Sequence, residues 1–329
     1  MAQDQKRTLL YPFLMMFYWN LSMHFRFILS SILLFLTVGC SSLGLLSPSN
    51  TLALDAVDMP KGDLAGLGPQ QVIATRLKID HQGEALSVVL YQPVDAPVNA
   101  PAIVFLPGLM APDDQYESYA RALASRGFIV AVRGWYSLFT SDLELAHDAN
   151  VLADWLITTQ GVDPKKIGVA GHSMGGKDAM LAASRYGVFA SVVAIDPDDN
   201  GKLSVAHGGL ISLMRAPLLL IGAEVAWQAS NICAPKENNY QRFFEQSSPG
   251  TVELTLKDAD HVQMLDEPDR FGYSICRCGT ADSRQVRIIA RRATVGFFLQ
   301  HLMSGPVFAK PEENQGIIRV AQNNHFMLE

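Results

Sequence analysis

The chain has 329 residues and a net charge of −6. Hydrophobic residues make up 49% of it and charged residues 18%, which excludes a disordered chain, a collagen and a coiled coil. The sequence has no basic stripe, so it lacks the electrostatic footprint of a nucleic-acid-binding protein, and its four Cys are too few for a disulfide scaffold. The composition therefore predicts a globular protein with a core of ordinary size.

An apolar segment precedes the globular part. Residues 9–38 are almost continuously apolar, and a short basic start, an apolar run and small residues at its end are typical of a secretory signal. Thr37-Val38-Gly39-Cys40 also resembles a bacterial lipoprotein box, in which Cys40 would carry the lipid. A retained membrane helix is the alternative, because about thirty apolar residues are long enough to span a bilayer. We expect an exported bacterial protein, either soluble after export or held at the membrane by this segment or by a lipid.

Changes in composition divide the chain into four parts. Residues 1–39 form the expected targeting segment, and the Ser-, Pro-, Gly- and Asp-rich stretch that follows predicts a tether over residues 40–70. A single globular domain is expected over residues 71–305, with a C-terminal tail over residues 306–329.

Strands and helices alternate within that domain. Two alternating, β-rich runs at residues 72–79 and 86–91 predict an antiparallel hairpin. Short, solidly apolar strands and helices of amphipathic spacing then predict an α/β fold, whose mostly parallel central sheet is covered by helices on both faces. The strands are expected at residues 102–106, 128–132, 166–170, 190–195, 217–221 and 252–256, and the helices at 116–126, 142–160, 175–186 and 290–303.

A G-x-S-x-G motif stands between a predicted strand and a predicted helix. In Gly171-His172-Ser173-Met174-Gly175-Gly176 the glycines permit a sharp turn that lifts the Ser hydroxyl to the edge of the sheet. We therefore predict Ser173 as a nucleophile, with the N–H of Met174 as one oxyanion-hole donor. The second donor should come from the loop after strand 102–106, where Pro107-Gly108-Leu109-Met110 offers the N–H of Leu109.

The general base must be a His that follows Ser173 in the chain, because α/β hydrolases with this turn place Ser, acid and His in that order. His261 follows the strand at residues 252–256 in a polar loop and is the preferred candidate, with His207 as its rival. His301, on a helix, and His172, inside the motif, are expected to be structural.

The acid that orients the base is less well defined. Its usual place, after strand 217–221, offers only Glu224. Asp196 ends the preceding strand, where its carboxylate can reach an imidazole Nδ1 atom. We predict Asp196 as the acid and keep Glu224, Asp198 and Asp199 as alternatives.

The remaining cysteines are Cys233, Cys276 and Cys278. Export implies an oxidising compartment, so a disulfide from Cys233 to either Cys276 or Cys278 is expected, and the sequence does not choose between them. One residue separates Cys276 from Cys278, which is not a zinc-knuckle spacing, and no His stands nearby in the sequence. We expect neither a metal nor another cofactor.

Four stretches together resemble the chlorophyllase family of α/β hydrolases. Gly171–Lys177 is similar to the family's GHSRGGK motif, and Ile195-Asp196-Pro197 to its IDP segment, whose Asp is the triad acid. Cys233-Ala234-Pro235-Lys236 resembles its CAPK stretch, and His261, with the Met-Leu-Asp that follows, resembles the segment that supplies the triad His. The resemblance covers roughly Ile73 to Leu302 and favours Asp196 over Glu224. It implies hydrolysis of the phytyl ester of chlorophyll to chlorophyllide and phytol.

The sequence departs from that family's nucleophile motif at Met174, where the family has Arg. Together with Pro107-Gly108, the GHSMGG motif also resembles bacterial cutinase-like polyester hydrolases, whose acid position corresponds here to Ala226. We expect a serine hydrolase of apolar esters, with polyester or lipid cleavage as the alternative. A lipoprotein that binds an apolar ligand on a non-catalytic hydrolase scaffold is the competing class. Five residues are candidates to line an apolar pocket: Met110, Tyr116, Trp135, Tyr136 and Trp227.

Overall fold

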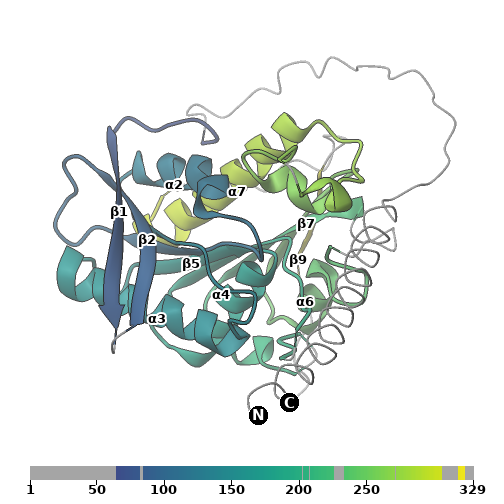
Figure 1. The fold of residues 1–329 in the computed structure, drawn as a ribbon, viewed down its shortest axis with the longest axis horizontal. Helices are drawn as coiled ribbons and strands as arrows, with labels where there is room; N and C mark the ends of the chain where they lie inside the picture. The colour runs from purple at the N-terminus through teal and green to yellow at the C-terminus, as the bar shows by residue number, and fades with distance from the viewer. Residues whose placement is uncertain are drawn as a thin grey trace, which may run out of the picture. The chain divides into compact units, whose positions relative to one another are not determined.

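The computed structural model describes the chain over residues 64–81, 84–201, 203–206, 208–225, 233–270, 272–305 and 318–322. Within these ranges, nine strands form one mixed sheet in the order β1-β2-β4-β3-β5-β6-β7-β8-β9 (Figure 1). All of them belong to one unit of the chain, Leu46–Glu329.

The strands and helices alternate along the chain much as the apolar pattern predicts. The strands are β1 (Val72–His81), β2 (Glu84–Pro93), β3 (Ala102–Leu106), β4 (Ile129–Arg133), β5 (Ile167–His172), β6 (Ser191–Ile195), β7 (Leu218–Ala223), β8 (Val252–Leu256) and β9 (Ile318–Gln322). The α-helices are α2 (Glu117–Ala124), α3 (Asp142–Gln160), α4 (Met174–Arg185), α6 (Tyr240–Gln246) and α7 (Ser283–Met303). Short 3-10 helices are η1 (Asp113–Tyr116), η2 (Ile211–Leu213), η3 (His261–Met264) and η4 (Ser274–Cys276).

The sheet is parallel at its centre and antiparallel at its edges. Strands β4, β3, β5, β6, β7 and β8 pair in parallel, in that order. The predicted hairpin of β1 and β2 joins β4 in antiparallel fashion, and β9 pairs antiparallel with β8 at the other edge. The mostly parallel sheet predicted from the solid apolar runs is thus confirmed.

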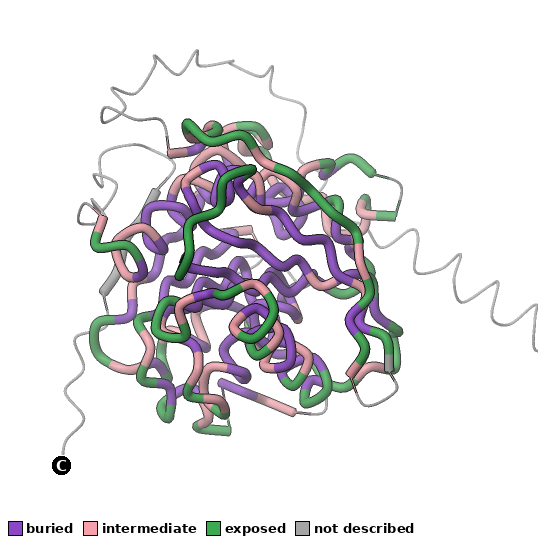
Figure 2. The backbone as a smooth tube through the Cα atoms, turned by 90° about the vertical axis from the view of Figure 1, so that its left-hand side faces the viewer, coloured by how far each residue is buried: buried purple, intermediate pink, exposed green. Residues whose placement is uncertain are grey.

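Two hydrophobic cores lie on opposite faces of the sheet. Along β3, Ile103 and Phe105 enter the core shared with α2 and α7, whereas Val104 and Leu106 enter the core shared with α3 and α4. This alternation follows from the two-residue period of a strand. Figure 1 shows α2 and α7 on one side of the sheet and α3, α4 and α6 on the other, and Figure 2 shows buried backbone through the middle of the domain and exposed segments around its periphery. The prediction of an α/β-hydrolase fold with helices on both faces is confirmed.

The structure differs from the sequence prediction at both ends of the domain. Residues 64–70, expected in the tether, bind the domain: the Gly68 N–H donates to Ser125 Oγ at 2.6 Å, and Arg126 donates to the Gly66 carbonyl at 2.8 Å. Strand β9 lies within the expected C-terminal tail. No helix of the described residues is both long and apolar enough to cross a membrane.

The parallel strands carry the candidate functional residues to one edge of the sheet. Their carboxyl ends lead into the segment after Leu106, Ser173, the turn at Asp196, Glu224 and the loop before His261. Ligands of open α/β sheets bind at this edge. The fold therefore brings residues that are far apart in the sequence to one place.

Candidate active site

Ser173 occupies a strained turn between β5 and α4. Its φ of 58° and ψ of −127° are unusual for a residue with a side chain. A Cβ on Gly171 would lie 2.1 Å from the Gly175 carbonyl oxygen, and a Cβ on Gly175 would lie 2.2 Å from the Leu106 carbonyl oxygen. Only glycine fits at these two positions, because backbone blocks both, and the turn has the geometry that the motif predicts.

The loop after β3 packs directly against Ser173. A Cβ on Gly108 would lie 3.1 Å from the Ser173 Cβ. The Ala111 N–H donates to the Gly108 carbonyl at 3.1 Å, which closes a turn with Met110 at a φ of 61°. In the part of the chain that the structure describes, the Leu109 N–H donates to no protein group, so this amide is free to bind an oxygen beside Ser173.

A buried carboxylate holds the imidazole of His261. His261 Nδ1 lies 2.6 Å from Asp196 Oδ2, with Asp196 fully buried and His261 5% exposed. The Ala223 N–H donates to the other carboxylate oxygen, Asp196 Oδ1, at 2.8 Å. The carboxylate is therefore fixed at both oxygens, and its partner imidazole is held with Nδ1 toward it.

The charge of Asp196 controls the protonation of His261. Burial opposes the charged imidazolium, but the hydrogen bond and the negative charge of Asp196 outweigh it, so the pKa of His261 is raised above its ordinary value. Asp198 and Asp260 add to this effect through their charge. The site is arranged to stabilise a proton on this imidazole.

The other candidate carboxylates have different partners. Glu224 Oε2 accepts a hydrogen bond from the Asp258 N–H at 3.1 Å. Asp198 accepts one from the Asn200 side chain at 2.9 Å, and Asp199 accepts two from the backbone at residues 205 and 206. Among these alternatives the structure brings only Asp196 into hydrogen-bond contact with His261.

The remaining histidines divide into three cases. The ring of His301 packs on Phe297, with ring centroids 4.4 Å apart on α7. The ring of His172 is buried and lies 4.6 Å from the ring of His261. His207 lies outside the described residues, as do Cys40, Ala226 and Trp227.

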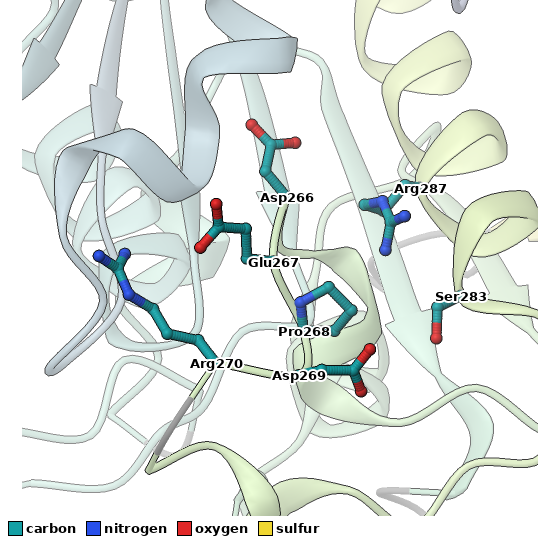
Figure 3. A pocket seen from close by; sticks show the side chains of 7 residues that line it. All are labelled: Asp266, Glu267, Pro268, Asp269, Arg270, Ser283 and Arg287. Atoms are coloured by element: carbon teal, nitrogen blue, oxygen red, sulfur yellow. The ribbon is translucent and has the colours of Figure 1, made fainter.

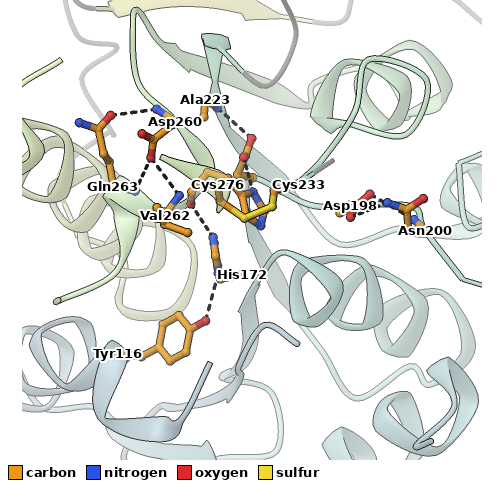
Figure 4. Close-up of polar contacts among 12 residues, drawn as sticks. Tyr116, His172, Asp198, Asn200, Ala223, Cys233, Asp260, Val262, Gln263 and Cys276 are labelled. Atoms are coloured by element: carbon orange, nitrogen blue, oxygen red, sulfur yellow. Dashed lines mark hydrogen bonds and ion pairs between the residues drawn. A yellow bond between two sulfur atoms is a disulfide. The ribbon is translucent and has the colours of Figure 1, made fainter. Parts of the chain in front are cut away.

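Asp260 fixes the short helix η3, which begins at His261. Its side chain accepts hydrogen bonds from the backbone of Val262 and Gln263, while the Gln263 side chain binds the Asp260 N–H in return (Figure 4). Asp260 Oδ2 also accepts the N–H groups of Cys278 and Gly279 at 2.9 and 2.8 Å. We did not predict this role, although the Asp-x-x-Gln spacing is a capping signal that indicates it.

A disulfide joins two loops of the domain. Cys233 bonds to Cys276, with Cα atoms 5.7 Å apart, which decides between the two pairings that the sequence left open (Figure 4). The bond connects the segment before α6 to η4, and η4 leads directly into the residues that bind Asp260. The disulfide thus restrains a loop that contacts the neighbour of His261.

The residues expected to line an apolar pocket separate into two groups. Tyr116 and Tyr136 are buried, and the Tyr136 hydroxyl donates to the Pro107 carbonyl at 3.2 Å. Met110 and Trp135 are instead 68% and 62% exposed. The two tyrosines therefore anchor the loops, and only the exposed pair is available to a ligand.

A cavity of about 440 Å³ lies between the segment after η3 and the start of α7 (Figure 3). Neither Ser173 nor His261 lines it, and charged side chains dominate its wall, so it is not the expected apolar pocket. Its lining residues are Asp266, Glu267, Pro268, Asp269, Arg270, Ser283 and Arg287. Within the described ranges, no group of three or more His, Cys, Asp or Glu side chains is placed to hold a metal ion.

Comparison with known proteins agrees with this architecture. The family model described as chlorophyllase matches residues 66–306. The chain belongs to the chlorophyllase family. It is 28% identical to chlorophyllase-1, chloroplastic, of Citrus unshiu over 225 residues, which are 61% of this chain and 67% of that protein.

Two other relatives match at slightly lower identity. The chain is 26% identical to chlorophyllase-2 of Arabidopsis thaliana over 216 residues, or 56% of this chain and 68% of that protein. It is 24% identical to chlorophyllase type 0 of Chenopodium album over 208 residues, or 55% of this chain and 59% of that protein. The matched segment thus spans about three fifths of the length of the Chenopodium relative. The membership places the chain among the α/β hydrolases at the level of the family.

Proposed function

We propose that the protein is a serine hydrolase of apolar carboxylic esters, similar in reaction to its chlorophyllase relatives. Ser173 is the nucleophile, His261 the general base and acid, and Asp196 the carboxylate that orients His261. The N–H groups of Leu109 and Met174 form the oxyanion hole. The observation that carries the proposal is the buried pair of His261 and Asp196, 2.6 Å apart, at the sheet edge that also carries the strained turn of Ser173.

The reaction follows from these groups. His261 accepts the hydroxyl proton as Ser173 Oγ bonds to the ester carbon, and the carbonyl oxygen becomes an anion bound by the two N–H groups. The anion collapses, the alcohol leaves with the proton from His261, and an acyl-Ser173 remains. Water then attacks the acyl group with His261 again as base, which releases the acid and restores the serine.

The apolar character of the substrate is supported by the loops around the site. The segments that follow β3 and β4 carry large exposed apolar side chains at five positions and no exposed charge among them: Leu109, Met110, Trp135, Leu138 and Phe139. Because β3 and β4 are neighbouring parallel strands, both segments leave the same edge of the sheet. The phytyl ester of chlorophyll, or a related lipophilic ester, fits such surroundings. We also propose that residues 1–39 direct export and that these residues or a lipid on Cys40 hold the enzyme at a membrane.

The experiment compares Ser173→Ala with Ser184→Ala, a serine on α4 whose hydroxyl binds the Met180 carbonyl. Each variant and the wild type is treated with a fluorophosphonate label and assayed on chlorophyll a, on p-nitrophenyl esters of increasing chain length, and on a polyester film. We expect Ser173→Ala to lose about 10³-fold or more of its activity and all labelling, and Ser184→Ala to keep both.

Two results would contradict the proposal, and a third would change the substrate class. Ser173→Ala activity within about tenfold of the wild type contradicts the serine mechanism. A wild-type protein that neither reacts with the label nor cleaves any ester indicates a non-catalytic scaffold. Cleavage of the polyester and not of chlorophyll a assigns the cutinase-like substrate class.

A further inference from the structure

A series of buried hydrogen bonds joins the loop after β3 to His261. The Gly108 N–H donates to the Tyr116 hydroxyl oxygen at 2.9 Å, and that oxygen lies 3.0 Å from His172 Nδ1. His172 Nε2 lies 3.0 Å from the His261 carbonyl oxygen. Tyr116 is 1% exposed and His172 is 2% exposed, so water does not compete for these bonds. Figure 4 shows Tyr116 and His172 in this arrangement.

The partners fix the direction of each bond. The His261 carbonyl can only accept, so His172 Nε2 carries a proton and donates it. Burial and the neighbouring His261 hold the pKa of His172 well below its ordinary value, so the ring is neutral and its Nδ1 accepts. Tyr116 therefore donates to Nδ1 while its oxygen accepts from Gly108, and burial keeps this hydroxyl protonated by raising its pKa. Every polar atom of the series has a partner of the correct kind.

We propose that Tyr116 and His172 are positioning residues that hold the oxyanion loop, residues 107–110, in a fixed place relative to His261. The inference rests on the ester hydrolysis proposed above. It gives a specific form to the structural role expected of His172 from the sequence, and it assigns to Tyr116 a role other than contact with the substrate.

The geometry of the loop explains how a bond at Gly108 controls the next residue. Tyr116 holds the Gly108 N–H, and Ala111 holds the Gly108 carbonyl at 3.1 Å. The Leu109 N–H belongs to the same planar peptide as that carbonyl and points the opposite way. With both polar groups of Gly108 restrained, the direction of the Leu109 N–H is set.

The other end of the series restrains His261 itself. His172 binds the backbone carbonyl of His261, and the two rings lie 4.6 Å apart at an angle of 33°. A Cβ on Gly108 would lie 3.0 Å from His172 Nδ1, so the loop rests directly on the ring. A shift of the His172 ring would therefore move the oxyanion loop and the base together.

Tyr119 provides a matched control for Tyr116. It is also fully buried, it lies three residues further along the chain, and its hydroxyl donates to the Met264 carbonyl at 2.9 Å. Met264 ends the same short helix that His261 begins, but no bond of the series passes through Tyr119. Tyr116→Phe and Tyr119→Phe each remove one buried hydroxyl, so both are expected to lower stability, whereas only the first breaks the series.

The test measures kcat and KM on a soluble p-nitrophenyl ester and the inhibition constant of a trifluoromethyl ketone. Ser173 Oγ adds to the ketone carbon, the serine proton passes to His261, and the carbonyl oxygen becomes an anion in the oxyanion hole. We expect Tyr116→Phe to lower kcat by roughly 10- to 100-fold, with KM within about twofold of the wild type. The ketone should bind more weakly by a similar factor. Tyr119→Phe should keep both constants within about threefold.

Equal kinetics for the two variants overturn the inference, whether both match the wild type or both fall together. Thermal unfolding and circular dichroism establish that each variant is folded. If Tyr116→Phe does not fold, His172→Asn replaces it, since its amide oxygen can still accept from Tyr116 while it is too short to reach the His261 carbonyl. Wild-type kcat and ketone binding in His172→Asn contradict the proposal. A wild-type protein that reacts with neither ester nor ketone contradicts the proposed function instead.

Discussion

Replacing Asp196 by Asn tests which carboxylate orients the base. The Ala223 N–H donates to Asp196 Oδ1 at 2.8 Å, so in Asp196→Asn the amide oxygen is retained at that position. The amide nitrogen then faces His261 Nδ1, which lies 2.6 Å from Oδ2 in the native protein. A donor at this point forces the imidazole proton onto Nε2. That nitrogen can then no longer accept the proton of Ser173.

The size of the effect follows from the tautomer. An imidazole held in the wrong tautomer costs a serine triad up to ~10⁴-fold in kcat, or about 5 kcal/mol of barrier. We expect Asp196→Asn to lose several orders of magnitude in kcat. The substitution also removes the negative charge that outweighs burial at His261, so the pKa of His261 falls. Any remaining activity should therefore persist to lower pH than in the wild type.

Glu224→Gln is the matched control. Glu224 Oε2 accepts a hydrogen bond from the Asp258 N–H at 3.1 Å, and a Gln oxygen can accept the same bond. We expect its kcat to stay within about tenfold of the wild type. The assay uses a short-chain p-nitrophenyl ester, with circular dichroism to show that both variants are folded. A larger loss in Glu224→Gln than in Asp196→Asn would refute the assignment.

Three further outcomes follow from the structure. The raised pKa of His261 means that kcat/KM falls as the pH drops through an apparent pKa above the ordinary value of histidine, because the protonated imidazole cannot accept a proton; a midpoint below that ordinary value contradicts this. The double variant Cys233→Ser, Cys276→Ser removes a bond between residues 43 positions apart and should lower the free energy of unfolding by up to about 4 kcal/mol. Urea unfolding measures this loss, and an unchanged midpoint would be inconsistent with it. Gly175→Ala should abolish folding or activity, since its Cβ would meet the Leu106 carbonyl at 2.2 Å; an active, stable variant shows that the turn can move.

The local pattern of apolar residues was enough to predict the central strands of the sheet, whereas the edge strand β9 depends on pairing with residues distant in the sequence. Solid apolar runs such as Ala102–Leu106 have no alternative to burial on both faces, so their place in a parallel sheet is readable. Strand β9, Ile318–Gln322, contains Arg319 and Gln322 and becomes a strand by pairing with β8, some sixty residues earlier. The pairing supplies hydrogen bonds that the pattern of this five-residue segment does not predict by itself.

The candidate site shows the same division. Ser173 and Asp196 stand at strand ends, where the order of elements predicts them, and the structure places Asp196 against His261. The partner of Cys233 could not be predicted, because Cys276 and Cys278 lie in the same loop, and the path of that loop decides which of them reaches Cys233. In the structure, Asp260 binds the N–H groups of Cys278 and Gly279, and in the same loop Cys276 bonds to Cys233.

The sequence predicted a structural role for His172 but not its hydrogen-bond partners, Tyr116 and the His261 carbonyl, which are distant in the chain. The chemistry of His172 also bears on the assignment of the base. Two imidazoles 4.6 Å apart repel each other when both are charged, so a proton on one ring lowers the affinity of the other ring for a proton. Asp196 attracts the proton to His261, whose pKa is raised, while burial and His261 hold the pKa of His172 well below its ordinary value. Neighbouring groups whose pKa values are pushed apart divide acid–base work between them. The neutral ring of His172 is suited to hydrogen bonds of fixed direction, and His261 is suited to take up and return the proton of Ser173.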